Sequence, residues 1–547
     1  MSDVTIDSTE SRRRDWTSEE SRRRVKRRYA ADRRLQLYGL AAIAFAVILL
    51  GVLIASLMQT GYQAFVQSKV ILEVYINPEH VKADDIRAGN FRLIARESFA
   101  RLFPDVTNRR DQSSLQKLLT SDAPYIVQSY VLNHPDSIGQ TVILPISLSD
   151  PFDQLHKGVI PAYLDALHAS RIRDFQKLQQ RGVVFVEGGK TGLEIDVHID
   201  PARVGAADPD YRAIVEEGIA AYFSRNRGRE YLDILGDGAA DAVKAFVEAN
   251  PGEVGKTVRI RVPLSEHYQT LSKGQTPQIV NPRMGSEKEV MWYRSLVDRG
   301  LVHTVFASEL FFNADSRFPE RAGLAGAIAG SFFALLVCFL LSFPIGIAAA
   351  VYLEEFAPKN RLTDLIEVNI NNLAAVPSVV FGLLGLAVFI GAFGLPRSAP
   401  LVGGMVLSLM TLPTIIITTR AALKAVPPSI REAALGVGAS KHQVMLHHVL
   451  PLAMPGILTG TIIGLAQALG ETAPLLLVGM NAFIPSIESF GMLEPATALP
   501  TQIFSWADSP ERGFVARTSA AILVLLGFLI VMNAIAIFLR QKFERKW

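Results

Sequence analysis

Six long apolar segments constrain this 547-residue chain more than any other feature. The first, Leu37–Met58, carries no charge in its 22 residues. At about 1.5 Å per residue, a helix of that length crosses a hydrocarbon core of about 30 Å. The other five are roughly Ala322–Tyr352, Leu365–Ile390, Leu401–Thr419, Pro455–Met480 and Thr518–Leu539. Because hydrocarbon offers backbone groups no partner, these segments predict an α-helical integral membrane protein with six transmembrane helices.

Residues 60–318 form a long polar region between the first two spans, and no run within it is apolar enough to cross a membrane. The chain has 547 residues, 49% of them hydrophobic, which is too apolar and too long for one ordinary soluble domain. Its single cysteine, Cys338, lies in an apolar segment. The polar region must therefore fold by its own core, without a disulfide.

Basic residues predict the orientation in the membrane. Residues 1–36 carry eleven of them, namely Arg12, Arg13, Arg14, Arg22, Arg23, Arg24, Lys26, Arg27, Arg28, Arg33 and Arg34. A nucleic-acid-binding arm is one interpretation, but a membrane span (37–58) follows at once, which favours a basic cytoplasmic tail. The C-terminal end is also basic, so both termini are predicted in the cytoplasm and residues 60–318 outside. The first apolar run is too long for a cleaved signal peptide.

The outer region repeats itself. LEVYINPEHV from Leu72 returns as LEIDVHIDPARV from Leu193, and NHPDSIGQTVILP from Asn133 returns as NPGEVGKTVRIRVP from Asn250. The preserved order predicts a duplication, with repeats at about 70–190 and 191–308.

Each repeat is expected to be α+β. The runs Ile71–Ile76 and Thr141–Ile146 are rich in β-formers and bounded by turn residues. Asn90–Phe103 has apolar residues at helical spacing. We therefore expect two similar α+β lobes.

Residues 431–455, REAALGVGASKHQVMLHHVLPLAMP, lie between two apolar segments and form the core of a loop at 427–455. The residues of interest are Glu432, Ala433, Ala434, Gly438, Leu450 and Pro451. Alanines favour a short helix, glycines allow a break, and prolines end one helix and begin another. The pattern predicts helix, turn and second short helix, either as a docking element or as an ordinary interfacial loop.

This spacing resembles the cytoplasmic EAA loop of ABC-importer permeases, E-A-A-x3-G-x9-I-x-L-P, with His448 in place of isoleucine. The membrane half further resembles the PstA-type permeases of phosphate ABC importers. The matching strings are PIGIAAAVYLEEFA from Pro344, NINNLAAVPSVVFGLLGL from Asn369, ALGETAPLLLVG from Ala468 and ALPTQIFSWA from Ala498. The resemblance covers about 320–540. It implies six helices of the ABC-importer permease type, with residues 320–547 as the permease domain. The duplicated α+β domain would then lie between helices 1 and 2.

The resemblance also implies a set of partners in a bacterial inner membrane. These are a second permease (PstC-type), a dimeric ATPase (PstB-type) that grips the EAA loop, and an extracytoplasmic phosphate-binding protein (PstS-type). The chain itself has no phosphate-cradling G-x4-G-K-[ST] loop, because Val184 and Asn250 replace the first glycine of the two nearest candidates. We therefore predict a transport protein that is not an enzyme, with no cofactor, no metal site and no nucleic-acid partner.

Candidate residues of the translocation path are Gln467, Glu471, Thr472 and Asn372. Glu471 is predicted inside the fifth span, where a carboxylate usually faces a partner or water. Gln467 is four residues earlier, on the same helical face, at a position where many relatives have arginine. Both residues either line the path or make a bundle-internal hydrogen bond. Asn372 lies at the mouth of the third span or caps it, and Pro377 is predicted to kink that span.

Two other functions compete with phosphate import. One is a permease for another oxyanion, such as sulfate or molybdate, and the other is a membrane sensor with an external ligand-binding domain. The outer region is expected to be a docking or gating domain rather than a second substrate site. Its basic residues Arg212, Arg225, Arg227 and Arg229 are interpreted as a solvated face.

Overall fold

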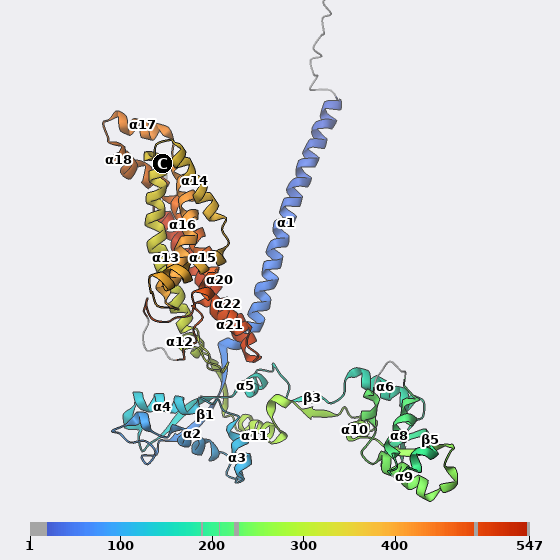
Figure 1. Ribbon diagram of the computed structural model, residues 1–547. Coiled ribbons are helices and arrows are strands. Elements are labelled where there is room, and N and C mark those ends of the chain that lie inside the picture. Colours follow the sequence, from blue (N-terminus) through green and yellow to red (C-terminus); the bar gives the residue numbers. More distant parts are fainter. Residues whose placement is uncertain (1–18, 188–189, 207, 224–228, 486–490, 544–547) are drawn as a thin grey trace, which may run out of the picture. The chain divides into compact units, whose positions relative to one another are not determined.

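The computed structural model describes residues 19–187, 190–206, 208–223, 229–485 and 491–543, and the chain divides into two units (Figure 1). The membrane unit comprises Met1–Gln67 and Thr304–Trp547, and the intervening unit comprises Ser68–His303. Every candidate span among the described residues belongs to the membrane unit. The first 18 residues, which include part of the basic tail, lie outside the described residues.

The membrane unit is built from long apolar helices. Five are able to cross a membrane singly, and a sixth crossing requires a bent helix pair to count as one span. They are α1 (Glu19–Phe65), α13 (Ala325–Val351), α16 (Pro400–Lys424), α19 (Leu450–Gly470) and α22 (Gly513–Phe543), with α14 (Arg361–Ala374) and α15 (Ser378–Leu384) as the bent pair. The structure thus has the predicted helical membrane architecture, with five spans or up to six among the described residues.

The predicted third span, Leu365–Ile390, differs most from expectation. α14 ends at Ala374, α15 begins at Ser378, and the two are bent by 103° at the break. Pro377 directly precedes α15. Proline has no N–H and disfavours helical backbone in the residue before it. The helix is therefore interrupted at Pro377, where the sequence predicted only a kink.

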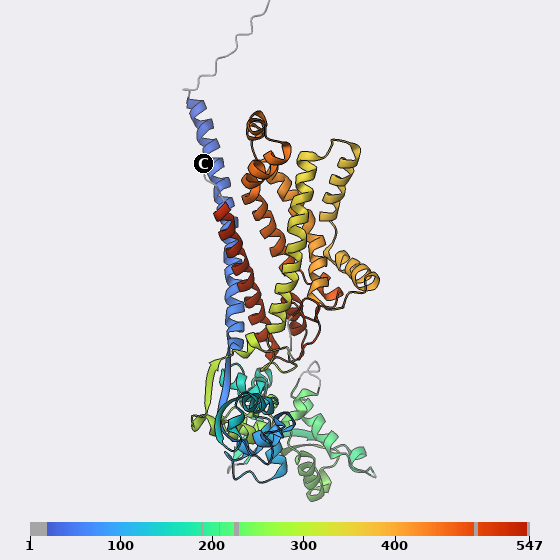
Figure 2. The same cartoon turned by 90° about the vertical axis from the view of Figure 1, so that its left-hand side faces the viewer.

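Small and hydroxyl side chains let α16 pack closely against α13 and α19. The Cys338 Sγ of α13 lies 3.4 Å from the Thr411 Oγ1 of α16. A Cβ added to Gly460 of α19 would lie 2.4 Å from the Cβ of Thr418 on α16, so only glycine fits there. Figure 2 shows α1 (blue) running beside α22 (red), which it contacts along the bundle.

Short helices close the end of the membrane unit away from the 427–455 loop. They are α12 (Glu309–Phe312), α20 (Ala473–Leu477) and α21 (Leu499–Ala507). α21 carries the ALPTQIFSWA string, and two of its polar side chains make internal hydrogen bonds. The Thr501 hydroxyl donates to the Met480 carbonyl at 2.5 Å, and the Trp506 indole donates to Asp315 at 3.1 Å. The structure therefore gives this string a local role in satisfying buried polar groups.

The intervening unit mixes short helices with antiparallel strands. Its helices are α2 (Phe91–Ala100), α3 (Arg109–Gln116), α4 (Ala123–Asn133), α5 (Asp150–His156), α6 (Ala169–Gln180), α7 (Pro201–Val204), α8 (Tyr211–Ala220), α9 (Ala239–Ala249), α10 (Glu266–Ser272) and α11 (Glu287–Asp298). The strands are β1 (Val66–Tyr75), β2 (Thr141–Ser147), β3 (Tyr163–Asp165), β4 (Val184–Glu187), β5 (Lys190–His198), β6 (Thr257–Pro263), β7 (Gln278–Val280) and β8 (Val302–Phe306). They form sheets in the orders β2-β1-β8, β4-β5-β6 and β3-β7.

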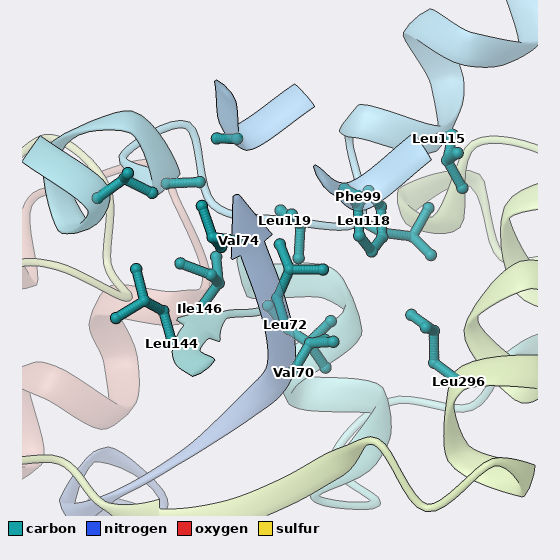
Figure 3. Packing of buried hydrophobic residues seen from close by; sticks show 14 of the residues in the cluster. Val70, Leu72, Val74, Phe99, Leu115, Leu118, Leu119, Leu144, Ile146 and Leu296 are labelled. Atoms are coloured by element: carbon teal, nitrogen blue, oxygen red, sulfur yellow. The ribbon is translucent and has the colours of Figure 1, made fainter. Parts of the chain in front are cut away.

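Two separate hydrophobic cores stabilise this unit. In the first, alternate residues of β1 point inward, as expected for a strand with one buried face. Figure 3 shows Val70, Leu72 and Val74 of β1 packed with Leu144 and Ile146 of β2. The second core contains the corresponding inward residues of β5 and β6.

Matching hydrogen bonds in the two lobes support the proposed duplication. In the first lobe the Gly139 N–H donates to the Ile76 carbonyl at 2.8 Å, and in the second Gly255 donates to Ile199 at 2.8 Å. The strand registers correspond as well, because Leu72 pairs with Leu144 where Ile195 pairs with Ile260.

The two cores do not follow the proposed repeat boundaries. The helix and strand that end the first repeat, α6 and β4, pack in the second core, and Glu194 N–H donates to Val183 at 2.7 Å. The equivalent α11 and β8 of the second repeat join the first core and sheet, where Ile71 N–H donates to Leu301 at 2.9 Å. Between them, β3 and β7 pair antiparallel about Leu164 and Ile279. The lobes thus exchange their terminal helix–strand segments.

Candidate coupling loop and translocation path

The Glu432-Ala433-Ala434 triplet lies on α17 (Pro428–Gly436), a short amphipathic helix. Ala434 is buried at 7% exposure and packs with Leu423 and Val444, while Glu432 and Ala433 are exposed. Pro428 begins the helix, where a missing N–H costs nothing. One face of α17 is therefore anchored to the bundle and the other is free to meet another molecule.

Gly438 forms the turn that follows α17. Its φ is 90°, a left-handed conformation that glycine adopts without strain. The Gly438 N–H donates to the Leu435 carbonyl at 2.9 Å, and Ala439 donates to Ala434 at 3.1 Å, which closes the helix end. Among the residues that the structure describes, a Cβ added at Gly438 would meet nothing within 4 Å. Within this chain the turn geometry, rather than close packing, requires glycine.

The segment after this turn differs from the expected second short helix. Lys441–Gly470 is one continuous helix of 30 residues that begins as α18 (Lys441–Gln443), passes through a π-helix at Val444–Val449, and continues as α19. Pro451 and Pro455 lie within this helix and do not delimit it. Proline clashes with the carbonyl four residues earlier. Wider π-helical turns immediately before Pro451 relieve that conflict.

His448, the departure from the EAA pattern, is exposed and lies in the π-helical segment. Leu450 is partly buried and begins α19. The Ser440 side chain accepts from the Gln443 N–H at 3.3 Å and so caps the start of this helix. From Ser440 onward, the loop therefore continues into the membrane bundle as uninterrupted helix.

An arginine that the sequence reasoning assigned no role holds α17 on the bundle. Arg431 donates from Nε and Nη2 to Glu355 Oε1 at 3.0 and 2.7 Å. It also donates to the backbone carbonyls of Val426 and Leu423, at 2.8 and 2.9 Å. Leu423 lies in the last turn of α16 and Val426 lies two residues beyond its end, where backbone carbonyls take partners from outside the helix. Arg431 therefore links α17 to the end of α16 and to the π-helix Tyr352–Phe356 that ends α13.

A second ion-pair group ties the same helix ends together. Arg420 of α16 donates to Glu354 at 3.3 Å and to Glu367 of α14 at 2.6 Å, and the Lys424 ammonium lies 3.6 Å from Glu354. Charged residues at the ends of apolar segments are the sequence signal that points to this group. Their pairing was not visible in the sequence, because Arg420 and Glu354 are separated by 66 positions.

Glu471 does not lie within a helix, which corrects the predicted location. α19 ends at Gly470, and Glu471 is extended with φ −78° and ψ 119°. It therefore does not share a helical face with Gln467. Glu471 is half-buried and Gln467 is exposed. Across the described residues, neither side chain has a hydrogen-bond or ion-pair partner.

The other two candidates occupy different elements. Thr472 follows Glu471 in the break, and its carbonyl accepts from the Leu476 N–H at 3.0 Å at the start of α20. Asn372 is exposed on α14, and its carbonyl accepts from the Ala375 N–H at 3.0 Å at the helix end. In the described chain no hydrogen bond joins the Asn372 side chain to Glu471 or Gln467.

Comparison with known proteins identifies the family. Residues 342–547 match the family described as binding-protein-dependent transport system inner membrane component. The phosphate transport system permease protein PstA of Haemophilus influenzae is 31% identical over 255 residues, which cover 46% of this chain and 86% of that protein. The chain belongs to the family of binding-protein-dependent transport system inner membrane components.

Other relatives cover the same half. The PstA protein of Yersinia pestis is 32% identical over 228 residues, 41% of this chain and 76% of that protein. A solved inward-facing MetNI methionine ABC transporter is 18% identical over 41% of this chain and 98% of that chain, with a TM-score of 0.32. Residues 22–166 and 189–281 match a domain of unknown function, DUF3333.

Family membership makes the chain a multi-pass inner-membrane protein and a permease subunit of an ABC importer, not itself an ATPase.

The two rejected P-loop-like strings lie in the intervening unit, and Gly188 and Gly189 of the first are outside the described residues. Among the residues the structure describes, no group of three or more His, Cys, Asp or Glu side chains is arranged to hold a metal ion.

Proposed function

We propose that this chain is the PstA-type subunit of an ATP-driven inorganic phosphate importer. The observation that carries the proposal is its identity of about 30% with PstA proteins across the permease half. The GETAPLL string, at Gly470–Leu476, and the ALPTQIFSWA string lie in that half. We infer a PstC-type second permease, a PstB-type ATPase dimer and a PstS-type phosphate-binding protein as partners.

The exposed face of α17 is the proposed docking site for the ATPase. Glu432 and Ala433 on that face are exposed, and the turn beside them combines the exposed Val437 with Gly438, which has no side chain. Arg431 ties the buried side of α17 to Glu355 at the end of α13. A displacement of α17 by the ATPase would therefore move the ends of α13 and α16 with it.

The continuous helix Lys441–Gly470 supplies a second route for the same motion. At about 1.5 Å per residue its 30 residues extend roughly 45 Å. It leads from the Gly438 turn to the break at Glu471. A rigid helix transmits displacement over its whole length, so movement of the loop would shift Glu471. This is the rigid-body motion expected for alternating access.

Gln467, Glu471, Thr472 and Asn372 are the proposed path residues. The Glu471 carboxylate would repel phosphate, so it is assigned to a basic group of the second permease. The Gln467 amide, exposed and without a partner in the described chain, has two N–H donors suited to an oxyanion. A role in packing against the second permease is the alternative for both residues.

The proposed orientation follows from charge. α17 and α18 lie at the end of the membrane unit where α1 begins (Figure 1). The basic start of α1 assigns that end to the cytoplasm, where ATP is available. The intervening unit would then be extracytoplasmic, with a docking or gating role toward the binding protein.

Reconstitution tests the proposal. The chain is purified together with its partners and placed in proteoliposomes. ATP is supplied on the side of the membrane where α17 lies, and labelled phosphate and the binding protein are supplied on the opposite side. ATP-dependent phosphate accumulation is the expected result. Accumulation of sulfate or molybdate in its place would refute phosphate specificity, and co-purification of a histidine kinase without an ATPase would favour a sensor.

A further inference from the structure

A basic pocket opens in the first lobe of the intervening unit, between α2, α3 and the residues that lead into α4. Figure 1 labels these three helices. Its volume is about 490 Å³, within the range of about 300–1,000 Å³ typical of small-molecule sites. Three arginines and three hydroxyl groups contribute to its lining, namely Arg92, Arg96, Arg109, Ser113, Thr120 and Ser121. No acidic side chain is among its described lining residues. The pocket therefore offers positive charge and hydrogen-bond donors to a ligand.

Three carboxylates that neighbour the lining residues in sequence do not line the pocket itself. Glu97 of α2 lies 3.8 Å from His80, and Asp111 of α3 lies 2.8 Å from the Lys288 ammonium of α11. Asp122, which precedes α4, is buried at 7% exposure and does not line the pocket. The charge of the three arginines is thus not neutralised by the pocket wall.

Arg92 and Arg96 stand four residues apart on the same side of α2, where like charges repel each other. The Arg96 guanidinium is oriented by Gln112, whose Oε1 accepts from Nη2 at 3.4 Å. Arg92 and Arg109 have no hydrogen-bond or ion-pair partner among the described residues. Guanidinium groups without an anionic partner are suited to bind the oxygens of an anion, often in pairs.

The second lobe provides an internal comparison. Its α8 begins as α2 does, because Asp210 accepts from the Ala213 N–H at 3.0 Å where Asn90 accepts from Leu93 at 3.1 Å. Counted from these caps, Arg92 corresponds to Arg212, and the position of Arg96 is occupied by Glu216. Arg212 and Glu216 form an ion pair at 3.2 Å. The second lobe thus supplies its own anion where the first lobe presents a second cation.

We propose that this pocket binds a phosphate group, either as inorganic phosphate or as a phosphate monoester. Three guanidinium groups match a doubly charged anion, and hydroxyl groups both donate to and accept from a partly protonated phosphate. The volume leaves room for the organic part of a small ester. This proposal replaces the sequence-based expectation that the region lacks a phosphate site, and it is compatible with a docking or gating role.

Sequence reasoning considered a different set of basic residues in this region and interpreted them as a solvated face. Of the basic residues it named, Arg225 and Arg227 lie outside the described residues, and Arg212 is paired with Glu216. The pocket arginines were not grouped, because Arg92 and Arg109 lie on different helices, and only the packing of α2 against α3 brings them to one cavity.

The test is equilibrium binding to the full-length chain in nanodiscs of zwitterionic lipid, measured by calorimetry at constant ionic strength. Inorganic phosphate and glycerol 3-phosphate are titrated separately. Arg96→Glu copies the Arg–Glu pair of the second lobe and keeps a good helix former on α2. Removing a charged hydrogen-bond donor should weaken binding on the order of ten- to a hundredfold. Arg92→Gln should weaken binding to a similar extent.

Arg212→Gln is the matched control, because it changes the corresponding arginine of the second lobe and should leave the affinity unchanged. Stronger binding of glycerol 3-phosphate identifies an ester as the ligand, and equal or stronger binding of phosphate identifies the inorganic ion. Absence of saturable heat for both ligands overturns the proposal. Binding that survives Arg96→Glu and Arg92→Gln unchanged also overturns it, since the site then lies elsewhere. The readout is binding, so a chain that transports no phosphate still tests the pocket.

Discussion

The ion pair between Arg431 and Glu355 is expected to carry motion from α17 to α13. Both side chains are 22% exposed, between a surface pair and a buried one. Exposed pairs contribute about 0–1 kcal/mol, and breaking a buried pair costs about 3–5 kcal/mol. We therefore expect about 2 kcal/mol for this pair, or roughly a 30-fold change in an equilibrium constant. Arg431→Met should lower the number of phosphate ions transported per ATP hydrolysed, while the chain still inserts and assembles.

A double-mutant cycle isolates the pair. Arg431→Met, Glu355→Gln and the double variant are compared in proteoliposomes that contain the complete complex. If the two residues act as a unit, the double variant should lose little more than either single variant. The exchanged pair Arg431→Glu with Glu355→Arg should recover part of the coupling. Arg361→Met is the control, since Arg361 is exposed and has no ion-pair partner in the described chain. Strictly additive losses, or unchanged transport in both single variants, would refute the reasoning.

Three further outcomes are expected. Gly438→Ala should cost about 1–2 kcal/mol of backbone strain yet keep the ATPase bound. Gly438→Trp should reduce the amount of ATPase that co-purifies with the chain. Equal retention of the ATPase by both variants would contradict its close approach to Gly438. Glu471→Gln should lower uptake per assembled complex, and a loss explained wholly by lower protein content would point to packing alone. Burial lowers the pKa of His156 below its usual 6.5, and its ring lies 2.9 Å from the Tyr293 hydroxyl. The folded state then favours the neutral ring, so the contribution of His156 to folding stability is full above pH 6.5 and is lost as pH falls. The stability measured by thermal unfolding should therefore decline between pH 7.5 and 5, and His156→Gln should make that decline less steep. An unchanged slope would exclude His156 as a cause of the decline.

The sequence by itself determined the features that depend on local rules. The bilayer requires long uncharged helices, so the run Leu401–Thr419 was enough to predict α16, which the structure extends to Pro400–Lys424. Glycine and alanine preferences likewise indicated a short helix and a turn around Gly438. The two similar β-rich strings predicted two similar lobes, and the matching hydrogen bonds of Gly139 and Gly255 support that prediction.

Counting apolar residues and helix breakers gave the wrong helix ends at two places in the membrane unit. The apolar run 455–480 looks continuous in sequence, yet the chain leaves the helix at Glu471. Pro451 and Pro455 are helix breakers by preference, yet they lie inside a helix that starts with a π-helical segment. The helix tolerates Pro451 and Pro455 although proline costs about 3 kcal/mol by preference, whereas the break at Glu471 lies between Gly470 and Pro474, both poor helix formers.

Only the tertiary structure decided which distant residues meet. Arg431 and Glu355 are 76 positions apart. The exchange of α6–β4 and α11–β8 between the lobes is likewise invisible to periodicity, because an apolar face does not specify which core it joins. The pocket of Arg92, Arg96 and Arg109 also depends on how α2 and α3 pack. Hydrophobic patterning specifies that a face is buried, but it does not specify against which partner. That choice is made by the packing of the whole chain.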